Sequence, residues 1–374
     1  MGYFYETSLI QHTPLIHFQA LQKGAGLRAT ELKPKFDRFL KEKLTKKLTK
    51  KELKKLYLNG QNAFDYKVFI EPILSKPKHI NNNYLFFGNM KNTPPHKIKK
   101  KKKARSLKIK FYSFKPEMIK YIEDYFEAFL ANTNFGTRQS KGFGSFYLDK
   151  KFNVSLIEAN KVYSFKTKNW EEDIAIFYKF LRAGINEKDF YTKPLIFLYA
   201  KKLEWEWDKR AIKEWFFSDE LEKQKQKYRN SDVLWFESDN KYLVRDLFGL
   251  STFQYWKTYG IKVTKKSVRK NEKGKSYYGR MKSPITFKVI NETVYFWVDN
   301  HFKRILGKDF LIFATGRPLK LSFPKNFDFD EMFKMIKNLN LSEIGKVKNR
   351  NKKLQDHEYF QKLNSILEDI KASL

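Results

Sequence analysis

Apolar and polar positions alternate in two stretches of the first half of the chain. Residues 3–16 and 105–114 carry aromatic and β-branched side chains at every second position, which predicts a strand in each. A weaker strand is expected within 65–87. Residues 144–157 follow a cluster of glycines and return to strand-like composition, so they predict a last strand or hairpin.

Helical spacing separates these strands. Residues 31–58 place Phe36, Leu40 and Leu44 on a partial apolar stripe, with Pro34 near the start, where a missing N–H costs little. Residues 116–133 begin with proline and continue with apolar residues at helical spacing. The resulting order is strand, helix, strand, strand, helix, strand. This βαββαβ order is ferredoxin-like and is shared with RNA-recognition (RRM-like) domains.

The second half has a less regular pattern and predicts a second, degenerate ferredoxin-like α+β domain. The expected strands are 193–200 and 309–314, with a hairpin over 283–299 that turns at Asn291-Glu292. The expected helices are 170–185, 208–217, 329–338 and 357–373. The domains are therefore 1–160, with a basic insertion at 76–104 and a glycine-rich loop at 134–146, and 161–374, which closes with helices.

The net charge of the chain indicates what kind of partner it binds. The 374 residues include 76 Lys and Arg against 41 Asp and Glu, a net charge of +35. So much positive charge repels itself unless a polyanion neutralises it, so nucleic acid is the expected partner. A genome rich in A and T would also raise the lysine content, but acidic residues would normally rise with it. A ribosome-associated or membrane-associated basic protein is the blander alternative, and the lack of a clean basic amphipathic helix counts against membranes.

Several kinds of chemistry are excluded or disfavoured. The chain has no cysteine, which excludes disulfides, thiolate metal sites and cysteine nucleophiles. The six histidines are scattered without HxxxH or HExxH spacing, so neither a metal site nor a cofactor is expected. The N-terminus lacks the pattern of a signal peptide, and no run is long enough for a membrane span. We expect a cytoplasmic protein.

The stretch NFGTRQSKGFGSFYL, 134–148, is the strongest candidate for binding. Three glycines allow close approach to a ligand, and turned backbone N–H groups can cradle phosphate. The stretch does not match a P-loop or a dinucleotide fingerprint. Phe143 either stacks on a base or anchors the loop. The simplest alternative is a glycine turn with solvated cations, but the loop holds Arg, Gln, Ser and Lys together, which favours RNA. Its candidate residues are Gly136, Arg138, Gln139, Ser140, Lys141, Gly142, Phe143 and Gly144.

A glycine-rich loop between the second helix and last strand of such a domain resembles the RAMP superfamily of CRISPR-associated RNA-binding proteins. Three further segments fit this likeness: 13–40, with GAGLRATELKPKFDRFL; VRDLFGLS at 244–251; and RMKSPITFKV at 280–289. The closest likeness is to the capping RAMP subunit of type III-B (Cmr) complexes, near the 3′ end of the crRNA. It implies a type III CRISPR effector subunit in antiviral defence, with crRNA or target RNA and other effector subunits as partners.

The resemblance also implies a binding groove, and it allows either a catalytic or a non-catalytic role; the missing aspartate described below leads us to expect no target cleavage. The glycine loop would grip the RNA backbone, and cations of the first helix and of the second domain would line the groove: Arg28, Lys33, Lys35, Arg38, Arg280 and Lys282. RAMP subunits that cut target RNA carry an aspartate between the first strand and the glycine turn. Here HFQALQKG, 17–24, has none. Asp37 lies within the helix pattern beside Lys35 and Arg38, where we expect a structural ion pair.

Two alternatives remain open. A RAMP endoribonuclease that processes pre-crRNA without metal uses histidine as a general acid–base, and His17, with His12 nearby, is the candidate here. A lone histidine beside a strand is more often a packing residue. The lysine run 97–103 with Arg105, and the lysine-rich helix 41–55, either are solvated or follow an RNA backbone without sequence preference.

Overall fold

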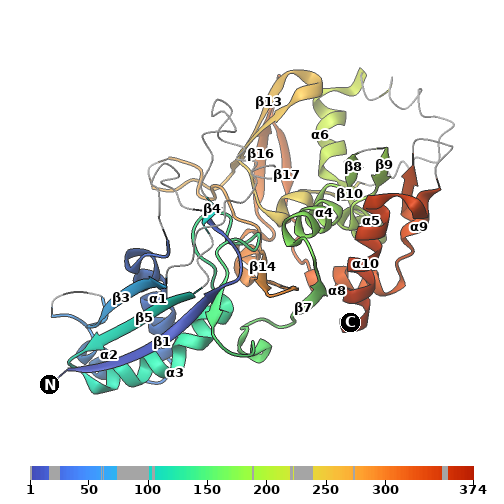
Figure 1. The fold of residues 1–374 in the computed structure, drawn as a ribbon. Coiled ribbons are helices and arrows are strands. Elements are labelled where there is room, and N and C mark those ends of the chain that lie inside the picture. The colour runs from blue at the N-terminus through green and yellow to red at the C-terminus, as the bar shows by residue number, and fades with distance from the viewer. Residues whose placement is uncertain are drawn as a thin grey trace. The chain divides into compact units, whose positions relative to one another are not determined.

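The computed structural model describes residues 2–16, 26–59, 61, 63–73, 101–102, 106–187, 189–219, 222, 239–272, 274–347 and 353–374. These residues form two compact units (Figure 1). Unit 1 contains Met1–Ile174 and Thr286–Trp297, and unit 2 contains Ala175–Ile285 and Val298–Leu374. The first unit therefore extends past residue 160 and takes in a hairpin from late in the chain. The fold is α+β, built on several small sheets.

Unit 1 is built on a four-stranded antiparallel sheet in the order β3-β5-β1-β6. Its strands are β1 (Tyr3–Gln11), β3 (Lys67–Ile73), β5 (Ser106–Ser113) and β6 (Phe146–Leu148). The predicted strands are found, except that β6 is short. Residues 149–157 form no second hairpin strand but a 3-10 turn at Val154–Leu156, which Asn153 caps by accepting from the Ser155 N–H.

Two helices, α1 (Ala29–Leu44) and α3 (Pro116–Asn132), pack against one face of this sheet (Figure 1). The predicted stripe is the reason, because Leu32, Phe36, Leu40 and Leu44 are all fully buried. The Phe36 ring lies 6.0 Å from that of Phe111 on β5, and 4.9 Å from that of Phe129 on α3. An aromatic core thus joins both helices to the sheet.

The predicted helix 31–58 is two helices. After α1 ends at Leu44, α2 (Lys50–Lys55) begins with a capping box, in which Thr49 and Glu52 exchange side-chain and backbone hydrogen bonds. Both residues are typical of this motif. The helix period continues across the break, which is why the apolar pattern alone does not reveal it.

Unit 1 also contains two smaller sheets. β2 (Leu15–Ile16) pairs with β4 (Lys101–Lys102), so the predicted loop 76–104 contains a short strand; its other residues lie outside the described part of the chain. β7 (Tyr163–Lys166) pairs with β15 (Thr293–Val298), which pairs with β14 (Ile285–Ile290). The predicted hairpin over 283–299 is therefore confirmed. Its turn holds Asn291 at φ +53°.

Unit 2 carries a six-stranded sheet in the order β10-β11-β17-β16-β13-β12 and a three-stranded sheet in the order β18-β9-β8. The strands are β8 (Ile185–Glu187), β9 (Phe190–Thr192), β10 (Glu206–Trp207), β11 (Lys241–Tyr242), β12 (Phe253–Trp256), β13 (Ile261–Ser267), β16 (Asp309–Phe313), β17 (Leu319–Ser322) and β18 (Gly345–Val347). The helices are α4 (Trp170–Arg182), which begins in unit 1, α5 (Leu195–Lys202), α6 (Asp208–Phe216), α8 (Phe329–Lys334), α9 (Leu341–Ile344) and α10 (Glu358–Ser373).

One prediction in this half is wrong. Residues 193–200, KPLIFLYA, were expected to form a strand, but they form α5, which follows Pro194 at the N-cap. Leu195, Ile196, Tyr199 and Ala200 are buried, which is helical spacing rather than alternation. A short apolar run does not distinguish a buried strand from a buried helix.

Unit 2 also buries a group of charges. The Lys265 ammonium donates to Asp246, and Asp208 Oδ2 lies 4.0 Å from both Lys265 Nζ and Arg245 Nε. Burial raises the pKa of Asp208, while Arg245 and Lys265 oppose that shift. Two carboxylates and two cations therefore balance inside this unit, so removing one of them would leave a buried charge without compensation.

No helix in the described part of the chain is both long and apolar enough to cross a bilayer.

Candidate RNA interface at the glycine-rich loop

The glycine-rich loop connects α3 to β6 within unit 1. A bridge between Asn134 and Ser145 closes its base, where the Phe135 N–H donates to the Gly144 carbonyl at 2.9 Å. The two ends of the loop are thus held together directly after the helix and before the strand. This is the position that the sequence pattern predicts for it.

Three separate segments anchor the loop. From the N-terminal strand region, Thr13 Oγ1 donates to the Gly142 carbonyl at 2.6 Å and accepts from the Ser145 N–H at 2.9 Å. From α1, Glu31 Oε1 accepts from the Gly136 N–H at 2.6 Å. From β14, the Phe287 N–H donates to the Ser140 carbonyl at 3.3 Å, and the Phe287 carbonyl accepts from Asn134 Nδ2 at 2.8 Å. The loop is therefore held in one conformation from several sides.

Gly136 and Gly144 occupy positions that tolerate only glycine. Gly144 has φ +66°, and a Cβ there would lie 2.0 Å from the Phe135 carbonyl oxygen. Gly136 has φ +77°, and a Cβ there would lie 2.5 Å from the carbonyl oxygen of Ile16. Both the left-handed backbone and the close approach of another backbone segment require glycine. These glycines serve the loop's own packing.

The backbone does not form the predicted phosphate cradle at four positions. The N–H groups of Gly136, Thr137, Lys141 and Gly144 already donate to the Glu31 carboxylate and to carbonyls of this unit. A donor held by a protein acceptor is not open to a phosphate oxygen. Any grip on RNA through these residues therefore depends on side chains.

Arg138 and Lys141 supply the positive charge, and both side chains are partly buried. Arg138 has φ +56°, a left-handed conformation that is uncommon for a residue with a side chain. Its guanidinium carbon lies 5.4 Å from the centre of the Phe143 ring, and Lys141 Nζ lies 5.6 Å from that of Phe287. Burial lowers the pKa of Arg138, and Glu171 opposes this. Both cations thus lie on aromatic faces at the loop.

Phe143 is an anchor in this structure. It is 4% exposed, and its ring packs edge-on against Trp170 at a centroid distance of 4.8 Å. Of the two roles that the sequence leaves open, base stacking requires an accessible ring face, and burial removes it. Phe143 therefore belongs to the packing beneath Arg138.

The four cations predicted on the first helix separate into different groups. Lys35 Nζ reaches the loop, where it donates to Gln139 Oε1 and to the Asn134 carbonyl, both at 3.1 Å. Lys33 does not; it pairs with Asp37 at 2.9 Å and donates to the Phe64 carbonyl. Arg28 is partly buried at the start of α1, and Arg38 is exposed. Asp37 is thus in the expected ion pair, but with Lys33 rather than with Lys35 or Arg38.

Sequence reasoning missed the central residue of this site. Lys288 on β14 is fully buried, and its ammonium donates to the carbonyls of Thr133 and Phe146, at 3.1 and 3.2 Å, and to Asn134 Oδ1 at 3.3 Å. Burial lowers its pKa from 10.5 to about 7. A single lysine inside the apolar run SPITFKVI was the available signal. Lys288 ties both ends of the loop to the late hairpin.

The remaining candidates lie elsewhere. Arg280 and Lys282 are exposed residues of unit 2 and belong to a different unit from the loop. His17 and most of the basic run 97–105 lie outside the described residues. His12 accepts from the Asn291 N–H through Nδ1 at 3.2 Å, which is a hydrogen-bonding role. In the described ranges, no three His, Cys, Asp or Glu residues are placed to hold a metal ion.

Comparison with known proteins decides the family. A model of the Cmr1 N-terminal domain matches residues 2–185, and a model of the Cmr1 C-terminal domain matches residues 191–364. The chain belongs to the Cmr1 family. Cmr1 proteins are RAMP proteins of type III-B CRISPR systems, so the likeness inferred from the loop and its companion segments is confirmed.

Two solved structures resemble this Cmr1-family chain. One is a chain in the cryo-EM structure of the Type III-B Cmr-beta bound to cognate target RNA, with 17% identity and a TM-score of 0.27; the match covers 40% of this chain and 59% of that one. The other is the crystal structure of Cmr1 from Pyrococcus furiosus in its apo form, with 11% identity, 97% and 96% coverage and a TM-score of 0.38. No curated protein sequence matches the chain.

Proposed function

We propose that this protein is an RNA-binding subunit of a type III CRISPR effector complex, which grips the backbone of crRNA or target RNA through the side chains of the 136–144 loop. It acts by recognition and has no catalysis of its own. In this proposal unit 1 is a ferredoxin-like domain, which its sheet order β3-β5-β1-β6 supports, and unit 2 is a degenerate second one. RNA and the other Cmr subunits are its partners, in the cytoplasm.

The observation that carries the proposal is the conformation of Arg138. A non-glycine residue at φ +56° is strained by roughly 1 kcal/mol or more, and such strain persists where surrounding structure imposes it. Anchors from three segments hold the loop in this conformation, so a guanidinium is kept where a glycine would fit the backbone better. Lys35, which also pairs with Glu31 at 3.0 Å, and Lys141, whose Nζ is buried, add positive charge at the same loop.

The test removes these two charges without disturbing the loop. Arg138→Gly accepts the left-handed backbone, and Lys141→Met keeps a long side chain against Phe287. We expect the double variant to keep its melting temperature and to bind single-stranded RNA more weakly. Two lost phosphate contacts should also reduce the salt slope of binding by about 1.4. Fluorescence anisotropy across a salt series measures both quantities.

The matched control is Lys54→Ala with Lys55→Ala on the exposed side of α2, which removes two charges away from the loop. This control should change RNA affinity less than the loop variant does. Equal losses would mean that net charge alone attracts RNA. An unchanged affinity in the loop variant would contradict the proposed grip directly.

The nuclease alternative has its own test. Incubation of the purified wild-type protein with repeat RNA, without metal, should leave the RNA intact. Cutting by the wild type that His17→Ala abolishes would favour the processing enzyme instead.

A further inference from the structure

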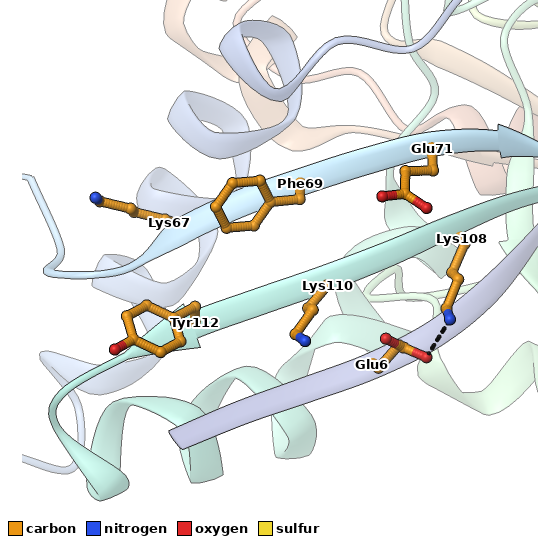
Figure 2. Close-up of a pocket in the computed structure, with 7 residues that line it drawn as sticks. All are labelled: Glu6, Lys67, Phe69, Glu71, Lys108, Lys110 and Tyr112. Atoms are coloured by element: carbon orange, nitrogen blue, oxygen red, sulfur yellow. Dashed lines mark ion pairs between the residues drawn. The ribbon is translucent and has the colours of Figure 1, made fainter. Parts of the chain in front are cut away.

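The sheet of unit 1 has a second face, opposite the one that α1 and α3 cover. Outward-pointing residues of β1, β3 and β5 surround a shallow hollow of about 580 Å³ on it (Figure 2). Its lining residues are Glu6, Lys67, Phe69, Glu71, Lys108, Lys110 and Tyr112. None of them belongs to the glycine loop. We call this surface the open sheet face.

Two phenylalanines on this face are strongly exposed. Phe69, on the edge strand β3, is 51% exposed, and Phe4, on β1, is 61% exposed. Strand side chains alternate between the two faces of a sheet. The residues that follow Phe4 and Phe69 along each strand pack against the core, so the Phe4 and Phe69 rings point away from it. Phe4 lies opposite Tyr112, whose ring contacts that of Phe114 at 5.2 Å. Aromatic rings therefore stand at the end and at the edge of the face.

Strand register places lysines between these rings. Lys110 lies between Glu6 on β1 and Phe69 on β3, and its Nζ is 4.5 Å from the centre of the Phe4 ring. Tyr112 likewise lies beside Lys67. Each ring thus has a lysine as a neighbour, which is the combination that unpaired nucleotides require: a flat surface for the base and a cation for the phosphate.

The two carboxylates of the face do not cancel this pattern. Glu6 Oε1 lies 2.8 Å from Lys108 Nζ (Figure 2). Glu71 lies opposite Lys108 on β3, and its negative charge also attracts the Lys108 ammonium. The negative charge therefore gathers around Lys108, at one side of the hollow. Lys67 and Lys110 are therefore the lysines that we expect to bind an anion beside the rings.

We propose that the open sheet face binds single-stranded nucleic acid, with an unpaired base stacked on Phe69 and phosphates held by Lys67 and Lys110. A folded protein partner would be favoured by a continuous apolar patch. Here Phe69 has charged neighbours on each side, with Lys110 opposite it on β5 and Lys67 and Glu71 two positions away along β3. The surface itself does not depend on the glycine loop; that the ligand is RNA rests on the function proposed above.

The decisive property is how each variant responds to salt. Phe69→Ala removes stacking, so it should weaken binding of an oligouridylate at least about fivefold without changing the salt slope. Lys67→Ala with Lys110→Ala should instead reduce the slope by about 1.4. Phe69→Tyr, which keeps an aromatic ring, should retain the wild-type affinity. Ultraviolet crosslinking of the wild type should attach a nucleotide to the peptide that contains Phe69.

Phe253→Ala is the matched control, because Phe253 on β12 of unit 2 is also 51% exposed. It should leave binding unchanged. An equal loss in both phenylalanine variants, or Phe69→Ala binding as the wild type does, would overturn the assignment. So would the loss of a co-purifying protein with RNA affinity intact, which would make the face a protein interface.

Measuring how the loop variant and the Phe69 variant bind the same RNA also distinguishes the two proposals. If Arg138→Gly with Lys141→Met binds normally and Phe69→Ala does not, the open sheet face stands and the loop proposal fails. The reverse result would leave the loop and refute the face.

Discussion

At the scale of single residues, Lys288 holds the glycine-rich loop and the late hairpin together. Its ammonium is fully buried and donates to three acceptors, two at the start of the loop and one in β6. Hydrogen bonds to neutral acceptors stabilise the charged form, whereas burial opposes it and lowers the pKa to about 7. The structural consequence is a late hairpin fixed to a loop that is more than a hundred residues away in the sequence.

The lowered pKa predicts a pH dependence of stability. Near and below pH 7 both the folded and the unfolded chain carry the proton, so the full penalty for burying the charge applies. Between about pH 7 and 10.5 the unfolded chain keeps the proton and the folded chain has released it, so the free energy of unfolding rises with pH. Relative to Lys288→Met, the wild type should gain stability over this range, by at most about 5 kcal/mol.

Urea unfolding of both proteins across that pH range measures the difference. Other titrating groups are present in both proteins, so their effects cancel in the comparison. A difference that stays constant, or that falls as the pH rises, would contradict the assignment.

At the scale of elements, the loop is a rigid connection rather than a flexible one. Its anchors come from Thr13, Glu31 and Lys288, which lie in three separate segments of unit 1. Such a connection positions Arg138 and Lys141 in advance, so less conformational entropy would be lost on binding the RNA that we propose as the ligand. The loop's glycines are therefore essential to its shape.

Gly144→Ala tests this rigidity. The new methyl group would meet the Phe135 carbonyl oxygen at 2.0 Å, on a backbone with φ +66°. We expect the free energy of unfolding to fall by at least about 2 kcal/mol, from left-handed strain and displacement of the backbone.

Gly26→Ala is its control, because nothing lies within 4 Å of a Cβ there. This control should change stability by no more than about 0.5 kcal/mol. Thermal and urea unfolding measure both variants. Similar stabilities of the two variants would show that the loop accommodates the added methyl group without losing stability, which would contradict its rigidity.

Elements with a clear period were predictable from the sequence. The strands at 3–11 and 106–113 and the helix at 116–132 follow alternation or helical spacing that one buried face imposes. The helix at 195–202 was not, because a short apolar run fits either structure. At the site, the loop and its two cations were visible in the sequence. The burial of Phe143 and the role of Lys288 depend on distant packing, which no local pattern records.

At the scale of the whole molecule, the net charge of +35 favours a polyanionic partner, and the chain belongs to the Cmr1 family. We propose two surfaces of unit 1 for RNA: the glycine-rich loop for the backbone and the open sheet face for bases. Unit 2 has exposed cations of its own, among them Arg280 and Lys282. Their contribution to RNA binding stays a prediction.

We propose above that this protein holds RNA as part of an effector complex. The most direct measurement is to purify the tagged protein gently from its native host and to sequence the RNA that it retains. We expect short RNAs that share one repeat-derived 5′ tag, recovered together with several partner proteins. Heterogeneous RNA without partner proteins would contradict this proposal and would leave a basic protein that binds RNA without selection.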